Sequence, residues 1–199
     1  MTKKALLIFT KNLEVGKVKT RLAATIGDEK ALSVYKQLVL NTASTTKHLP
    51  IDKFVFYSNA IEEDDVWNGN NFHKEVQQGN DLGERMKNAF AAIFQKGYDK
   101  AVIIGTDCPS LKGNIIQDAF NKLVDVDVVI GPALDGGYYL LGMKKCYPFL
   151  FEDMHWSTAN VIAETIRRCK SRGLLFLLLE ALQDIDEEED LETLNFVEQ

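Results

Sequence analysis

Short apolar runs alternate along the chain with segments of helical periodicity, and this alternation restricts the fold more than any other feature. Residues 5–9 (ALLIF) form a continuous apolar run, which is typical of a strand buried on both faces of a parallel sheet. Similar strand-like runs follow at residues 54–57, 101–104, 126–130, 138–141 and 174–179. Between these runs, apolar residues recur every three or four positions, which predicts helices over residues 31–42, 82–93, 115–124 and 161–169.

This order of elements predicts an α/β fold with three layers (α/β/α), in which helices cover both faces of a mostly parallel sheet. Ligands bind such folds beyond the carboxyl ends of the strands. The length of 199 residues suits one domain over residues 1–199, and 46% hydrophobic with 26% charged residues is ordinary for a globular chain. Asp81 and Asp186 each begin an Asp-x-x-Glu pattern, which is a variant of the capping box and predicts a helix start.

The composition argues against several classes of protein. The longest apolar runs are far below the roughly 18 residues of a membrane span, and the first lacks a signal-peptide cleavage pattern, so we expect a cytoplasmic protein without a membrane partner. The three cysteines are widely separated and lack metal-binding spacing. A formal net charge of −6 argues against nucleic acid as a partner. The three histidines are unclustered, which argues against a Ser-His-Asp hydrolase.

The segment after the first strand, residues 10–22, is rich in cations. It holds Lys11, Lys17, Lys19 and Arg21, but neither the GxxxxGK[ST] nor the GxGxxG pattern. In an extended segment the last three cations share one side, and in a helix Lys17 and Arg21 still share a face. Converging Lys and Arg side chains suit a pyrophosphate group. The segment is therefore interpreted either as a phosphate-binding loop or as a solvated loop.

Three acidic residues follow predicted strands. Asp107, in Asp-Cys-Pro, is either a ligand for a divalent cation or part of an Asx-Pro turn. Asp135 precedes Gly136 and Gly137, which form either a close approach to a ligand or a tight turn between strands. Asp186 follows the last strand, where it is either the N-cap of an acidic helix or a metal ligand.

Trp156 and Cys108 lie near these segments and are also considered as site residues. Trp156, followed by Ser157 and Thr158, precedes a predicted helix, so this segment is either an N-cap with a packed indole or a substrate-stacking site. Cys108 is adjacent to Asp107, whose charge would raise the pKa of the thiol. We therefore do not expect Cys108 to be a nucleophile.

Six motifs together resemble one family across nearly the whole chain. They are residues 16–22 (GKVKTRL), 79–86 (GNDLGERM), 104–111 (IGTDCPSL), 131–139 (GPALDGGYY), 156–158 (WST) and 184–191 (DIDEEEDL). The sequence resembles the GT-A-like glycosyltransferases that are associated with radical-SAM and selenodomain proteins and linked to arsenosugar biosynthesis. Two prolines of the family loop are replaced here by Leu13 and Val15, and the family's Thr-Pro after the second Asp of its last motif is replaced by two glutamates.

The resemblance implies a nucleotide-diphospho-sugar transferase (GT-A) fold, which is also used by enzymes that transfer guanylyl or cytidylyl groups to small phosphorylated acceptors. It also implies that the Lys/Arg loop holds the nucleotide phosphates and that Asp107 holds Mg²⁺ or Mn²⁺. We therefore expect a metal-dependent transferase that moves a sugar from a nucleotide sugar to a small-molecule acceptor. The alternatives are a nucleotidyltransferase, which would use a nucleoside triphosphate and release pyrophosphate, and a non-catalytic nucleotide-binding protein.

The expected site residues fall into four groups. The predicted catalytic residues are Asp107 and Lys17, and the predicted metal ligands are Asp107, Asp135 and Asp186. The predicted nucleotide-binding and phosphate-binding residues are Lys11, Gly16, Lys17, Lys19, Arg21, Gly79, Asp81, Gly83 and Arg85. The predicted acceptor region comprises Asp135, Gly136, Gly137, Tyr138, Trp156, Ser157 and Thr158.

Overall fold

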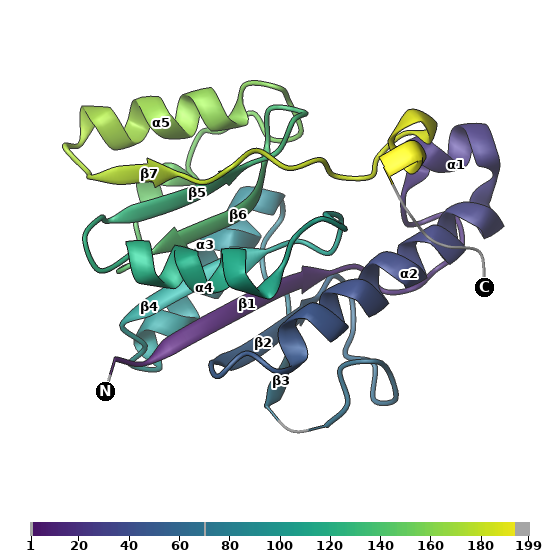
Figure 1. The fold of residues 1–199 in the computed structure, drawn as a ribbon, viewed down its shortest axis with the longest axis horizontal. Coiled ribbons are helices and arrows are strands. Elements are labelled where there is room, and N and C mark those ends of the chain that lie inside the picture. Colours follow the sequence, from purple (N-terminus) through teal and green to yellow (C-terminus); the bar gives the residue numbers. More distant parts are fainter. Residues whose placement is uncertain (1, 70, 194–199) are drawn as a thin grey trace.

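A computed structural model describes residues 2–69 and 71–193 (Figure 1). Over these residues, seven strands form one sheet in the order β3-β2-β1-β4-β6-β5-β7. The strands are β1 (Lys4–Thr10), β2 (Asp52–Tyr57), β3 (Phe72–Val76), β4 (Lys100–Ile104), β5 (Val128–Pro132), β6 (Tyr138–Met143) and β7 (Phe176–Leu178). All neighbouring strands are parallel except β6, which is antiparallel to both β4 and β5. The predicted mostly parallel sheet is confirmed.

Helices cover both faces of this sheet, so the predicted three-layer α/β/α arrangement is also confirmed. The α-helices are α1 (Thr20–Ile26), α2 (Asp28–Lys47), α3 (Leu82–Gln95), α4 (Gly113–Lys122) and α5 (Val161–Ser171). Two short 3-10 helices, η1 (Pro148–Leu150) and η2 (Glu188–Thr193), complete the described elements. Among the residues described, no helix is both long and apolar enough to cross a membrane.

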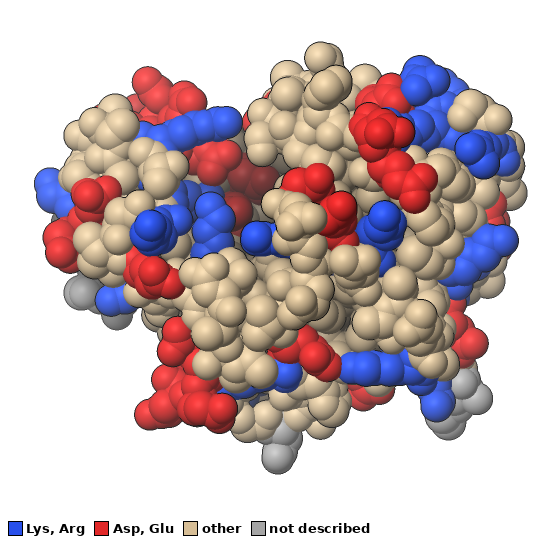
Figure 2. Space-filling model, turned by 180° about the vertical axis from the view of Figure 1, so that it is seen from behind, with Lys and Arg blue, Asp and Glu red and all other residues tan. Residues whose placement is uncertain are grey.

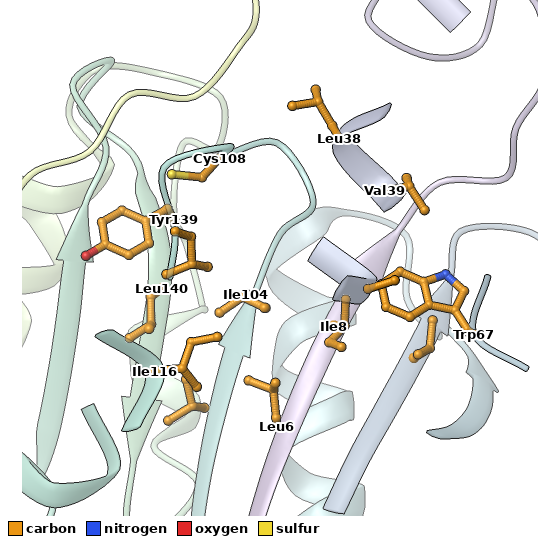
Figure 3. Close-up of a cluster of buried hydrophobic side chains, with 14 of the residues drawn as sticks. Leu6, Ile8, Leu38, Val39, Trp67, Ile104, Cys108, Ile116, Tyr139 and Leu140 are labelled. Carbon is orange, nitrogen blue, oxygen red and sulfur yellow. The ribbon is translucent and has the colours of Figure 1, made fainter. Parts of the chain in front are cut away.

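Alternate residues of each strand pack against different helix layers, because successive side chains of a strand point to opposite faces. On one face, Leu6 and Ile8 of β1 join Ile104 of β4 and pack with residues of α2 and α4, among them Ile116 (Figure 3). On the other face, Ala5 and Leu7 pack with residues of α3 and α5. Burial on both faces explains why β1 is an unbroken apolar run.

The segment after β7 runs past the carboxyl ends of the strands and brings η2 beside α1, which follows β1 early in the sequence (Figure 1). The backbone N–H of Ile185 donates to the Asp107 carbonyl at 3.0 Å. This bond holds the crossing segment against the loop that follows β4. Residues far apart in the sequence therefore meet where the strands end.

Two local predictions about helix starts have different outcomes. Asp81 is the N-cap of α3, and its carboxylate accepts a hydrogen bond from Glu84 N at 2.9 Å. The predicted capping box at Asp186 is wrong, because the Asp190 carboxylate instead accepts from the backbone N–H groups of Asp186 and Glu187, each at 2.8 Å. The Asp186 side chain is therefore not used as a cap.

Candidate functional site

A cleft of about 710 Å³ opens at the edge of the sheet where β1 to β4 end and β6 begins. Figure 2 shows acidic side chains deep in a hollow of this molecule, with basic side chains near its rim. The cleft is lined by both signs of charge and, on another side, by large apolar side chains. The charged lining residues are Lys11, Arg21, Arg85, Asp107, Asp135, Asp184 and Asp186, and the apolar lining includes Phe9, Leu82, Met86, Tyr138 and Trp156.

A second cavity of about 290 Å³ shares Arg21, Asp135, Asp184 and Asp186 with this cleft. Its other lining residues come mainly from the segment after β7, including Gln183 and residues 187 and 190. The four shared side chains therefore lie where the two cavities adjoin.

Lys19 bridges two of the carboxylates. Its Nζ lies 2.7 Å from Asp107 Oδ1 and 2.9 Å from Asp186 Oδ1, although its side chain is only 5% exposed. Burial lowers the pKa of Lys19, but the Asp107 and Asp186 carboxylates outweigh burial and raise the pKa above its ordinary value. Arg21 approaches the same Asp186 carboxylate from the exposed side, at 4.0 Å. Lys19 is therefore a charged lysine held inside the protein by two acids.

Asp184, another carboxylate of the cleft, is strongly affected by burial. Its Oδ1 atom is buried and has no hydrogen-bond partner among the described residues. Burial, followed by the nearby charge of Asp107, raises the pKa of Asp184 to about 7, whereas Lys19 opposes the rise. Asp184 is therefore poised to exchange a proton near neutral pH. Sequence reasoning did not select it as a site residue, although it lies in the DIDEEEDL motif.

Tyr35 of α2 connects the loops that follow β1 and β4. Its hydroxyl oxygen accepts a hydrogen bond from Lys11 N at 2.8 Å. The same oxygen lies 2.9 Å from Thr106 Oγ1 and 3.3 Å from Thr10 Oγ1. Because Tyr35 is almost fully buried, these contacts hold together the segments that follow the neighbouring strands β1 and β4. Sequence analysis placed Tyr35 in the apolar stripe of a helix and missed this polar role.

The cationic segment does not present all of its charges in one direction. Lys11 and Arg21 line the cleft, Lys19 points to the acids, and Lys17 is exposed outside the cleft lining. The backbone explains this divergence, because Lys19 has a left-handed conformation (φ 47°, ψ 48°) immediately before α1 begins. The predicted single cationic face is therefore divided, and the predicted catalytic role of Lys17 stays a prediction.

The predicted nucleotide loop beyond β3 lies along the same edge. Arg85 lines the cleft, and its Nε donates to the Gly79 carbonyl at 3.1 Å. Gln77 also lines the cleft, and its Nε2 donates to the carbonyls of Thr10, at 3.3 Å, and Phe56, at 2.9 Å. Four other residues that were predicted to contact the nucleotide do not line the cleft: Gly16, Gly79, Asp81 and Gly83. Their predicted contact with nucleotide remains untested.

Tyr138, Phe151 and Trp156 form an aromatic corner at one side of the cleft. The rings of Tyr138 and Trp156 meet edge to face with centroids 6.5 Å apart, and Phe151 stacks on the indole at the same separation. Gly83 packs so closely on the indole that a Cβ atom would collide with it. The predicted packed indole is confirmed, but the N-cap of the following helix is Asn160 rather than Ser157 or Thr158.

The turn between β5 and β6 packs against the segment that follows Trp156. Asp135 Oδ1 accepts a hydrogen bond from Gly137 N at 2.8 Å, which makes the tight turn that was one of the two interpretations of this motif. Gly136 has φ 90°, and a Cβ atom there would collide with the backbone of Ala159. Asp135, Gly137, Tyr138, Ser157 and Thr158 line the cleft together. The structure therefore brings most of the predicted acceptor region to one wall.

Cys108 lies in the cleft lining but is buried. Burial, together with the Asp184 charge, raises the pKa of the Cys108 thiol to about 12. The thiol is therefore protonated near neutral pH, as expected for a residue that is not a nucleophile.

The acids do not form a complete metal cage in the described chain. Across residues 2–69 and 71–193, no group of three or more His, Cys, Asp or Glu side chains is arranged to hold a metal ion. Asp107 and Asp186 converge on the ammonium group of Lys19, so a cation already stands between two of the three predicted ligands. Carboxylate oxygens are the ligands that Mg²⁺ and Mn²⁺ prefer, and Mg²⁺ is commonly held by only one or two carboxylates plus substrate phosphates.

Comparisons with known proteins identify the family. Residues 41–158 match the family described as "Uncharacterized protein conserved in bacteria (DUF2064)". None of the curated proteins matches the sequence. A crystal structure of a "putative nucleotide-diphospho-sugar transferase" from Desulfovibrio desulfuricans G20 is 35% identical, has a TM-score of 0.87, and the match covers 94% of this chain and 84% of that chain.

More distant structures share the fold. The 4-diphosphocytidyl-2C-methyl-D-erythritol synthase of Anaerococcus prevotii DSM 20548 is 10% identical with a TM-score of 0.65, over 96% of this chain and 94% of that one. The inositol-1-phosphate CTP transferase of T. maritima is 13% identical with a TM-score of 0.59, over 96% and 91% of the two chains. The chain therefore belongs to the DUF2064 family and has the nucleotide-diphospho-sugar transferase fold.

Proposed function

We propose that the protein is a metal-dependent transferase that moves a sugar from a nucleotide sugar to a small acceptor. The observation that carries this proposal is the pairing of cations and carboxylates in one cleft at the carboxyl ends of the strands. The Lys and Arg side chains of the cleft can bind phosphate groups, and its carboxylates can bind the divalent cation that accompanies a nucleotide. A crystal structure 35% identical to this chain, described as a "putative nucleotide-diphospho-sugar transferase", supports the proposal.

In this proposal, Lys11 and Arg21 bind the phosphates of the donor. Both line the cleft, and Arg21 also lies 4.0 Å from Asp186, so it can contact a phosphate beside the acids. The Tyr35 contacts hold the backbone of Lys11 in place. Arg85 lies on the wall beyond β3, where its bond to Gly79 fixes the side chain near the entrance to α3. These residues would orient the donor before any bond is broken.

Asp107 and Asp186 would hold Mg²⁺ or Mn²⁺, with Asp135 and Asp184 lining the same part of the cleft. The all-oxygen donor set and the buried, unpartnered Oδ1 atom of Asp184 fit a hard divalent cation. When bound, such an ion neutralises the negative charge that develops on the departing nucleoside diphosphate. The aromatic corner around Trp156 would receive the acceptor and exclude water from one side.

The reaction can be tested by incubating the protein with nucleotide sugars in one reaction and with nucleoside triphosphates in another. A cell extract supplies acceptors, and mass spectrometry identifies the products. Release of a nucleoside diphosphate together with a product heavier by one sugar supports the proposal. Release of pyrophosphate with a product heavier by one nucleotide would replace it with nucleotidyl transfer. Tight nucleotide binding without either product would instead indicate a non-catalytic nucleotide-binding protein.

A further inference from the structure

Lys19 combines three features that rarely occur together in a lysine. Its backbone lies in the left-handed region, which is unfavourable for a residue with a Cβ atom. Its side chain is buried, although lysine is among the residues least often buried. It also precedes α1 without giving that helix a side-chain cap. The local structure alone therefore does not account for a lysine at this position.

The contacts of the ammonium group supply the missing stabilisation. Nζ lies within 2.9 Å of one oxygen of Asp107 and one oxygen of Asp186. Asp107 comes from the loop after β4 and Asp186 from the segment after β7, so one cation joins two separate segments to the start of α1. Without a cation between them, the two carboxylates would repel each other in a partly desolvated site.

We propose that Lys19 is an exchangeable counter-cation, whose ammonium group competes with a divalent cation for the carboxylate oxygens of Asp107 and Asp186. The inference rests on the proposed function and adds to it an order of binding. An ammonium group and a divalent cation that contact the same carboxylate oxygens repel each other. The two oxygens therefore cannot bind both cations strongly at the same time. The flexible stem of lysine allows the ammonium group to leave the acids and contact a phosphate oxygen instead.

This exchange couples the two ligands of the site. In the nucleotide-free protein a divalent cation must displace Lys19, so its binding is weak. A nucleotide offers Lys19 an alternative anionic partner, so nucleotide raises the affinity for the cation and the cation raises the affinity for nucleotide by the same factor. Lys19 therefore disfavours loading of the cation before the donor arrives.

The test measures Mn²⁺ binding in the absence of nucleotide, from the electron paramagnetic resonance signal of free Mn²⁺. In Lys19→Met, we expect the affinity for Mn²⁺ to rise by about tenfold or more, because a positive charge has been removed next to both carboxylates. Lys36→Met is the matched control, since Lys36 is exposed on α2 and the variant loses the same charge. Its affinity should stay within about twofold of wild type, because exposed charges at a distance are screened.

The double variant Lys19→Met/Asp107→Asn tests whether the increased affinity for Mn²⁺ comes from binding at the carboxylate oxygens next to Lys19. It should lose the increase in affinity, whereas an increase that persists would show that Mn²⁺ binds elsewhere and would contradict the proposal. Unchanged or weaker Mn²⁺ binding by folded Lys19→Met would also overturn it. Nucleotide calorimetry on the wild type separates the two proposals, since retained nucleotide binding would leave the proposed function in place when the Lys19 proposal fails.

A measurement on the wild type covers the case in which Lys19→Met does not fold. A buried ammonium group held by two carboxylates exchanges its protons slowly enough to be followed by nitrogen-detected NMR of ¹⁵N-labelled lysine side chains. Saturating Mg²⁺ with nucleotide should shift this resonance by changing its partners. A Lys19 resonance that stays unchanged while backbone amides around Asp107 report cation binding would contradict the exchange.

Discussion

The hydroxyl oxygen of Tyr35 lies 2.9 Å from Thr106 Oγ1 and 2.8 Å from the backbone nitrogen of Lys11. One buried phenol thus links the end of β1 to the loop that carries Asp107. The two loops carry side chains of opposite charge, since Lys11 is a proposed phosphate ligand and Asp107 is a proposed metal ligand. Helix α2 therefore sets the distance between the cationic and acidic parts of the site.

Tyr35→Phe should weaken both the fold and the cleft. The variant keeps the packed ring but leaves the Lys11 N–H and the Thr106 hydroxyl without their partner, which should lower the free energy of unfolding by about 1–2 kcal/mol. Nucleotide affinity should fall as well, because Lys11 is no longer held. Urea denaturation and calorimetry measure the two effects. Tyr98→Phe, which loses an exposed 2.8 Å bond to Asp52, is the control and should leave affinity unchanged. Wild-type values for both measurements in Tyr35→Phe would contradict this role.

Asp184 should make the stability of the cation-free protein depend on pH. Its pKa is about 7 in the folded protein and near 4 when unfolded, so the folded state binds the proton more tightly. This contribution is fully present below pH 4 and is lost as the pH rises towards 7, because the buried carboxyl must then ionise. Asp184→Asn removes that cost, so its stability relative to wild type should increase between pH 5 and pH 8 by about 2–4 kcal/mol.

Urea denaturation in a metal chelator at the two pH values tests this expectation. Asp118→Asn, which changes an exposed carboxylate on α4, serves as the control and should give nearly the same difference from wild type at both. A difference between Asp184→Asn and wild type that does not vary with pH would show that Asp184 does not titrate near neutrality.

Gly83→Ala should disturb the aromatic corner. A Cβ atom at this position meets the Trp156 indole, which is itself packed against Phe151 and Tyr138. Overpacking of this kind costs about 1–3 kcal/mol in unfolding free energy. Trp156→Leu in the same chain should recover part of that loss, because the smaller side chain leaves room for the methyl group. Purely additive effects of the two substitutions would show that Gly83 and Trp156 do not constrain each other.

The sequence predicts those elements whose apolar pattern is set by packing in the core. The central strands are buried on both faces, whereas the four long helices each bury a single apolar stripe, and both patterns placed the elements within a few residues. Strand β3 was missed, because it lies at the sheet edge and its residues (FHKEV) are only partly buried. Helix α1 was missed because seven residues give too few turns for a periodic pattern to emerge.

The sequence analysis predicted which charged residues lie near the site, but not where their side chains point. Lys17, Lys19 and Arg21 were expected to act together, yet the left-handed backbone at Lys19 turns its side chain inward. The local sequence does not predict that backbone conformation, since Lys19 is neither Gly nor Asn. The raised pKa of Asp184 likewise depends on burial and on the nearby charge of Asp107, which is far away in the sequence. Such relationships arise only once the topology places the strand ends together.

The central claim is that the cleft binds a nucleotide sugar through Lys11, Arg21 and a divalent cation. Isothermal calorimetry with UDP-, GDP-, CDP- and ADP-sugars in the presence of Mn²⁺ tests this claim most directly. The account predicts saturable binding of at least one donor by the wild type. Arg21→Ala should weaken that binding by about 1–3 kcal/mol, whereas Arg167→Ala, which removes an exposed partner of Glu164 on α5, should not change it. Folded wild-type protein that gives no heat of binding with any of the four donors would contradict the account.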